Sequence, residues 1–104
     1  MIIWEMKCKF MSINEQKHMM DLKFWTIVSK GIYRFVVAAN CCYEIHIIHH
    51  SLEQSIIDAE ANLYISGDWY DVTKGINYFS RELIHTGRVK ECLENAKEDY
   101  IKNM

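Results

Sequence analysis

The chain has 104 residues and a formal net charge of −2, with half of its residues hydrophobic and a quarter of them charged. This length corresponds to one domain, and the composition is that of an ordinary globular protein, which argues against disorder. No apolar run reaches the roughly 18 residues that a transmembrane helix needs. The opening MIIWEMKCKF contains Glu5 and has no long apolar core, so it does not resemble a secretory signal. We therefore expect a cytoplasmic protein.

The domain organisation is expected to be simple. The sequence shows no repeat, no low-complexity tract and no linker, so residues 1–104 are predicted to form a single α+β domain. Residues 1–11 are predicted to be a loosely ordered extension, because MSINEQ from Met11 onward resembles a natural beginning.

A capping box predicts the first helix. Ser12 is followed three residues later by Glu15, so a helix should begin at about Ile13 and end before Gly31, which tolerates the left-handed backbone. The β-branched run TIVS weakens the last turn of this helix, which leaves a strand over 24–29 as the alternative.

Alternating β-branched and aromatic residues then predict four strands, at 32–39, 42–50, 62–72 and 76–85. Residues 51–61 should connect the second strand to the third. In the third strand, Leu63, Ile65 and Trp69 are expected to share a face, with a bend or bulge at Gly67.

A second helix should follow the strands. Thr86 is the expected N-cap, and an apolar stripe at helical spacing follows it: Val89, Cys92, Leu93, Ala96 and Tyr100. The predicted fold is therefore α+β, a four-stranded antiparallel meander with an N-terminal and a C-terminal helix packed on the sheet.

The stretch CCYEIHIIHH (41–50) has the residue types of a metal or catalytic site. On a strand, His46 and His50 would lie about 13 Å apart and His49 would point the opposite way. Two nitrogens so far apart cannot both lie within about 2 Å of one zinc ion. We therefore predict a strand with no metal site and no cofactor.

Cysteine chemistry is also not indicated. The four cysteines, Cys8, Cys41, Cys42 and Cys92, are expected to be free thiols, because no secretory signal is recognised and the cytosol keeps thiols reduced. A bond between the neighbours Cys41 and Cys42 would also be strained. A nucleophilic Cys42 would need a nearby base, and no spacing to a histidine requires one. The four glycines form no phosphate-binding loop. We predict that the protein is not an enzyme; a His/Cys-dependent hydrolase or metal-binding protein is the alternative.

Charge is distributed unevenly along the chain. No Lys or Arg occurs between Arg34 and Lys74, whereas six acidic residues do: Glu44, Glu53, Asp58, Glu60, Asp68 and Asp71. These acids fit either a solvated rim or a face that binds a basic partner. Large aromatics in the same segment fit either packing or an interface. The candidate partner-binding residues are Glu60, Asp68, Trp69, Tyr70 and Asp71.

Two further interpretations remain open. Lysines alternate with aromatic residues in KCKF and KFW, which is the pattern of a small RNA-binding module that stacks bases. An antiparallel sheet also exposes two edge strands, which could pair two copies into a homodimer.

The chain resembles small, proline-poor accessory proteins of phages and mobile elements, including anti-CRISPR proteins. The resemblance extends over the whole chain and rests on its size, the absence of proline, and the richness in Ile, Lys, Asn and Tyr that suits an AT-rich coding source. It implies a cytosolic inhibitor of a host defence ribonucleoprotein, such as an RNA-guided, RNA-cleaving effector, and possible contact with RNA through that partner. It assigns no role to any particular residue and implies no membrane.

Overall fold

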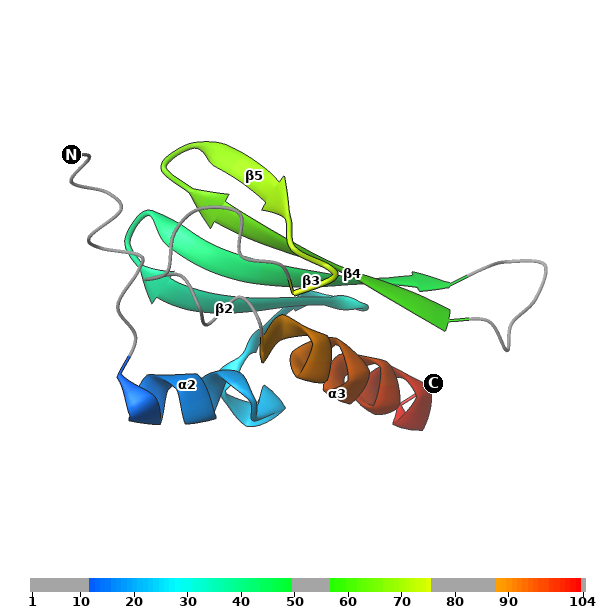
Figure 1. The fold of residues 1–104 in the computed structure, drawn as a ribbon. Helices are drawn as coiled ribbons and strands as arrows, with labels where there is room; N and C mark the ends of the chain where they lie inside the picture. The colour runs from blue at the N-terminus through cyan, green and yellow to red at the C-terminus, as the bar shows by residue number, and fades with distance from the viewer. Residues whose placement is uncertain (1–11, 50–56, 76–87, 104) are drawn as a thin grey trace.

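The computed structural model describes residues 12–49, 57–75 and 88–103. One antiparallel sheet carries two helices on one of its faces (Figure 1). The α+β class, the antiparallel meander and the packing of helices on the sheet are therefore confirmed. Within the described residues, however, the sheet already has five strands, in the order β1-β2-β3-β4-β5, where four were expected.

The first helix is shorter than expected. Helix α2 spans Ile13–Met19 and begins at the predicted capping box, in which Ser12 and Glu15 exchange two hydrogen bonds of 3.0 Å. A 3₁₀ turn, η1 (Leu22–Phe24), follows, and Thr26–Ser29 forms strand β1. The prediction of a helix up to Gly31 was therefore wrong. The β-branched residues adopt the strand that their side chains favour.

The next two strands agree with the expected ranges to within a residue. Strand β2 spans Ile32–Ala38 and β3 spans Cys41–His49, and the two pair in an antiparallel hairpin. The pairing contains a bulge between Val36 and Ala38.

The segment after β3 departs from the prediction twice. Strand β4 spans Ile57–Ile65, so it begins within the expected connection and pairs with β3 from His49↔Ile57 onward. The strand predicted over 62–72 is two strands, because the chain reverses at Ser66 and Gly67 and returns as β5 (Asp68–Asp71). Both turn residues have positive φ, 47° and 101°, as a two-residue hairpin turn requires. The predicted strand over 76–85 lies outside the described residues.

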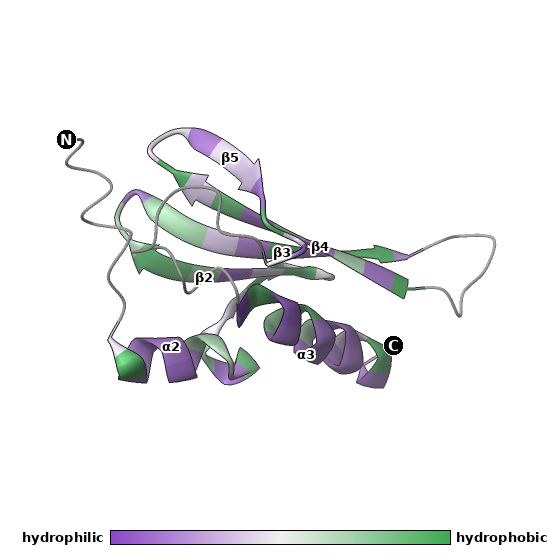
Figure 2. Cartoon of the chain, in the orientation of Figure 1, coloured by the Kyte–Doolittle hydropathy of each residue, from purple (hydrophilic) through white to green (hydrophobic). Residues whose placement is uncertain are grey.

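Helix α3 (Val89–Lys102) packs on the sheet with its predicted stripe. Val89, Cys92, Leu93 and Ala96 are buried, and Tyr100 is partly buried. Glu91, Glu94 and Glu98 of the helix are exposed, whereas Asp99 accepts a hydrogen bond of 2.8 Å from the hydroxyl of Tyr33. Hydropathy alternates along the strands (Figure 2). The expected cap at Thr86 lies outside the described residues, and Arg88 occupies the N-cap without a capping side chain.

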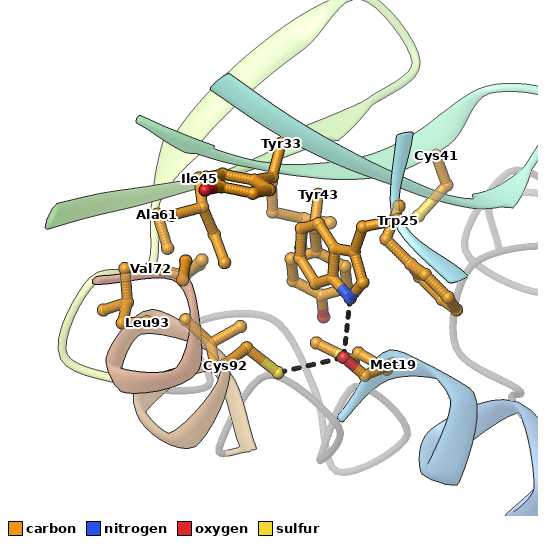
Figure 3. Packing of buried hydrophobic residues seen from close by; sticks show 14 of the residues in the cluster. Met19, Trp25, Tyr33, Cys41, Tyr43, Ile45, Ala61, Val72, Cys92 and Leu93 are labelled. Carbon is orange, nitrogen blue, oxygen red and sulfur yellow. Dashed lines mark hydrogen bonds between the residues drawn. The ribbon is translucent and has the colours of Figure 1, made fainter. Parts of the chain in front are cut away.

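The core lies between the helices and one face of the sheet (Figure 3). Strands β2, β3 and β4 contribute the buried residues Tyr33, Phe35, Cys41, Tyr43, Ile45, Ala61, Leu63 and Ile65. The carbonyl oxygen of Met19, at the end of α2, accepts hydrogen bonds from Nε1 of Trp25 at 2.7 Å and from Sγ of Cys92 at 3.3 Å. These bonds connect both helices and the start of the sheet.

No helix among residues 12–49, 57–75 and 88–103 is both long and apolar enough to cross a membrane.

Candidate functional site

The face of the sheet opposite the helices carries a mixed set of charged, aromatic and apolar side chains. We call it the open face; its described residues include Arg34, Val36, Cys42, Glu44, His46, Asp58, Glu60, Asn62, Tyr64, Trp69 and Asp71, as the strand registers determine. The described helices lie on the other side (Figure 1). Because this face is not used for the core, it is the natural place for a binding surface.

Cross-strand pairing arranges the open face in rows. Arg34, Glu44, Asn62 and Asp71 form one row across β2, β3, β4 and β5. The row toward the β4–β5 turn contains Val36, Cys42, Tyr64 and Trp69. On the other side of the first row, His46 pairs with Glu60. Polar groups thus occupy the middle of the face, with an aromatic and apolar row beside them.

Glu44 is the central charged residue of this face, and it is buried, with 6% of its surface exposed. One carboxylate oxygen, Oε2, accepts a hydrogen bond from Nε of Arg34 at 2.7 Å, and a second contact comes from the same guanidinium. The other oxygen, Oε1, lies 2.8 Å from Nε2 of His46. Both oxygens of the buried carboxylate are therefore satisfied.

These contacts decide the charge of Glu44. Burial is the largest single influence and would by itself raise the pKa of Glu44, but the hydrogen bonds and positive charge from His46 and Arg34 together outweigh it and lower the pKa. The same contact with Glu44 raises the pKa of Arg34. The pair is therefore ionised at neutral pH. The carboxylate can only accept a hydrogen bond, so Nε2 of His46 is assigned as the donor.

Trp69 and Tyr64 form an aromatic pair at the edge of the face. Their ring centroids are 5.1 Å apart and their planes are inclined by 55°. Half of the surface of Trp69 remains exposed. Such a ring, held by a neighbour and still exposed, is a typical anchor in protein interfaces.

Two hollows lie on the open face, on either side of Trp69. The first, of about 390 Å³, has Glu44, His46, Asn62 and Trp69 as its described lining residues, and most of its exposed lining is apolar. The second, of about 280 Å³, is mainly apolar, and its described lining residues are Arg34, Val36, Ala38, Ala39, Cys41, Cys42, Glu44, Tyr64 and Trp69. Glu44 and Trp69 line both hollows.

The described side chains of the open face offer charged, aromatic and apolar contact surface. Cys42 and His46 share a face, but residues four apart on a strand lie about 13 Å apart, too far for a thiol and its base. Among the described residues, Cys41, Cys42 and Cys92 are not joined in disulfides. In the described part of the chain, no group of three or more histidine, cysteine or carboxylate residues could hold a metal ion. His50 lies outside the described residues.

The five predicted partner-binding residues do not form one surface. Trp69 and Asp71 pair with Tyr64 and Asn62 and lie on the open face, as does Glu60. Asp68 and Tyr70 pair with the buried Ile65 and Leu63, so they lie on the helix-bearing side, where Tyr70 packs against the core. The expectation that Trp69 shares a face with Leu63 and Ile65 was therefore wrong, because the turn at Ser66 and Gly67 places it on a separate strand.

Four residues of the site were not predicted from the sequence to lie together: Arg34, Glu44, Asn62 and Tyr64. A signal for Glu44 existed, since it is a single acid within an otherwise apolar and histidine-rich strand. Its partner Arg34 lies ten residues earlier, across a short hairpin.

Comparison with known proteins identifies no relative: no family model and no curated protein matches the sequence, and no solved structure matches the fold.

Proposed function

We propose that this chain is a small non-catalytic binding protein that acts by surface complementarity, with the open face as its docking surface and a basic protein surface as its partner. The observation that carries the proposal is the half-exposed Trp69, which lies between two hollows on a sheet face that the described helices leave uncovered.

Charge supports a basic partner. Four acids lie on the described open face, Glu44, Asp58, Glu60 and Asp71, against one arginine. Arg34 is already paired with Glu44, and among the described residues neither Glu60 nor Asp71 has a salt-bridge partner. The face is therefore negative, which favours association with a positive surface and opposes the phosphates of RNA.

The narrower form of the proposal is an inhibitor, encoded by a phage or mobile element, of a host defence ribonucleoprotein. The nucleic-acid channel of such a particle is a basic surface, and a negative, aromatic sheet face is complementary to it. The size, the proline-free composition and the resemblance to anti-CRISPR proteins support this form. It predicts action in the host cytosol.

Charge reversal on the two sides of the sheet tests the proposal. Tagged wild-type protein, Glu60→Lys and Asp68→Lys are used to capture proteins from a lysate of the native host, with and without nuclease. Asp68→Lys is the matched control, because it makes the same charge change on the side away from the open face.

We expect wild type and Asp68→Lys to capture the same basic protein or nucleoprotein, and Glu60→Lys to lose it. Nuclease sensitivity would show that RNA bridges the contact. Equal capture by all three proteins would eliminate the open face as the docking surface. Recovery of nucleic acid without protein would replace the proposal with an RNA-binding function.

A further inference from the structure

The two hollows beside Trp69 both expose mostly apolar surface, but different side chains line them, and these side chains indicate what kind of partner segment fits. Their volumes, about 390 and 280 Å³, lie at or below the lower end of sites for small-molecule ligands. Each hollow is therefore suited to a side chain rather than to a large cofactor. Trp69 forms a wall that the two hollows share.

The first hollow, lined by Glu44, His46, Asn62 and Trp69, favours a cationic group. The charge of Glu44 is balanced by Arg34, but two lining residues have a carboxylate as their cross-strand neighbour: Glu60 lies across from His46, and Asp71 lies across from Asn62. The exposed face of an indole attracts a guanidinium or ammonium group. Asn62 adds an amide oxygen that accepts hydrogen bonds from such a donor. A planar guanidinium satisfies all three features at once.

The second hollow favours an aliphatic group. Val36 lies at its edge with 63% of its surface exposed, and Ala38, Cys42 and Tyr64 contribute further apolar surface. Covering this exposed valine with another apolar side chain removes apolar surface from water, which favours binding.

We propose that the open face recognises an extended peptide segment that presents a basic side chain and an aliphatic side chain on the same side, one on each side of Trp69. In an extended peptide, residues two apart point to the same side, so an Arg-x-Leu or Leu-x-Arg segment presents both groups together. The inference rests on the proposed function and identifies the partner's recognition element as polypeptide.

Nuclear magnetic resonance of the full ¹⁵N-labelled chain tests this inference with defined probes. The probes are the tripeptides Ac-Arg-Gly-Leu-NH₂ and Ac-Leu-Gly-Arg-NH₂, because the direction of the segment is not specified. The matched controls replace arginine by the neutral isostere citrulline, or leucine by glycine. The readouts are the indole N–H of Trp69, the side-chain amide of Asn62 and the backbone amide of Val36.

We expect one of the two arginine peptides to shift the signals of Trp69, Asn62 and Val36 in a saturable way. Citrulline should weaken binding about tenfold and remove most of the shift at Asn62, and glycine in place of leucine should remove the shift at Val36. Trp69→Ala should abolish saturation, whereas Asp68→Lys should not. Equal effects of the arginine and citrulline peptides would overturn the inference.

A uridine octamer serves as the competing occupant. Stronger shifts at Trp69 and Asn62 with the octamer than with either peptide would replace the peptide by single-stranded RNA and overturn the inference. If Glu60→Lys loses a captured partner while the peptides leave Trp69 unmoved, the proposed function stands and the peptide inference falls. If the peptides bind at Trp69 but no partner is captured, the peptide site stands and the ribonucleoprotein partner falls.

Discussion

The carboxylate of Glu44 lies 2.7 Å from Nε of Arg34 on the neighbouring strand, and the two side chains differ sharply in exposure. The side chain of Glu44 is 8% exposed, whereas that of Arg34 is 43% exposed. The positive charge of the partly exposed Arg34 therefore compensates the negative charge of the buried Glu44. His46 satisfies the second oxygen, so the same acid also holds the imidazole that borders the hollow shared by Glu44, Asn62 and Trp69.

Removal of Arg34 should destabilise the fold more than its exposure suggests. Arg34→Met leaves the buried Glu44 with His46 alone, and an incompletely paired buried charge is costly. The melting temperature of Arg34→Met should fall by several degrees. The double variant Arg34→Met/Glu44→Met should recover part of the loss, because an apolar pair replaces the ionic one.

The control for these Arg34 variants is Lys97→Met, which removes one partner of the ion pair between Lys97 and Glu94 on the surface of α3. Exposed pairs at helical spacing contribute only about 0.3–0.5 kcal/mol, so this variant should melt close to wild type. Equal melting temperatures for Arg34→Met and wild type would show that solvent, rather than Arg34, compensates Glu44.

Glu44 should also make stability depend on acid pH. Its pKa is lowered in the folded protein from an ordinary value of 4.5. A lowered folded pKa means that the unfolded chain binds the proton more tightly, so the stabilisation is complete above about pH 4.5 and is lost as pH falls toward the folded pKa. The free energy of unfolding of wild type relative to Glu44→Gln should be constant from pH 6 to 8. It should shrink below pH 4.5, as urea denaturation at each pH would measure.

If the difference in free energy of unfolding between wild type and Glu44→Gln increased below pH 4.5, the pKa of Glu44 would not be lowered in the folded protein. The comparison with the glutamine variant removes the contributions of other acids, such as Asp71, whose pKa is lowered by hydrogen bonds from Thr73.

Much of the fold follows from local sequence patterns, because these patterns report local physics. The capping box located the start of α2, the alternation over 42–50 located β3, and the stripe of α3 identified its buried residues. The end of α2 was not predictable in the same way. It depends on Trp25, whose indole reaches back to the carbonyl oxygen of Met19 through tertiary packing.

The site was less predictable because it depends on register. In the hairpin of β2 and β3, Ala38 pairs with Cys41, but Val36 pairs with Cys42. The bulge between them therefore shifts the β3 partner of each residue of β2 before Ala38 by one position. Without the bulge, Arg34 would face Ile45 in place of Glu44. A one-residue shift changes which side chains meet on a face, and nothing in the local pattern indicates it.

The same substitution at two tryptophans, the buried Trp25 and the half-exposed Trp69, tests which of them stabilises the fold. Trp25→Phe removes the indole donor to the Met19 carbonyl and leaves a small gap in the core, so it should lower the free energy of unfolding by about 1–2 kcal/mol. Trp69→Phe makes the same chemical change on the open face and keeps an aromatic ring beside Tyr64, so its effect should stay within about 0.5 kcal/mol.

Urea denaturation of both variants at neutral pH measures these differences. A loss for Trp69→Phe as large as that for Trp25→Phe would mean that Trp69 supports the fold, which would weaken its assignment as a binding residue.

The thiols should differ in reactivity according to their burial. Cys92 is almost fully buried, and burial, reinforced by the charge of Glu91, raises its pKa to about 12. Both Cys41 and Cys42 line the apolar hollow, but Cys41 is buried, with 1% of its surface exposed, whereas Cys42 is only partly buried. Since the thiolate is the reactive form and must be accessible, Cys42 should react well before Cys41 and Cys92 with a thiol reagent in native conditions.

A Cys8→Ser background excludes the cysteine that lies outside the described residues. Timed alkylation with iodoacetamide, followed by peptide mass spectrometry, should show modification at Cys42 first and at Cys41 and Cys92 only on unfolding. Occupation of the apolar hollow by the aliphatic side chain of Ac-Arg-Gly-Leu-NH₂ or Ac-Leu-Gly-Arg-NH₂ should slow the reaction of Cys42, because that residue lines the hollow. Reaction of Cys92 as fast as that of Cys42 would mean that α3 separates from the sheet in the native state, since only such opening exposes its buried thiol.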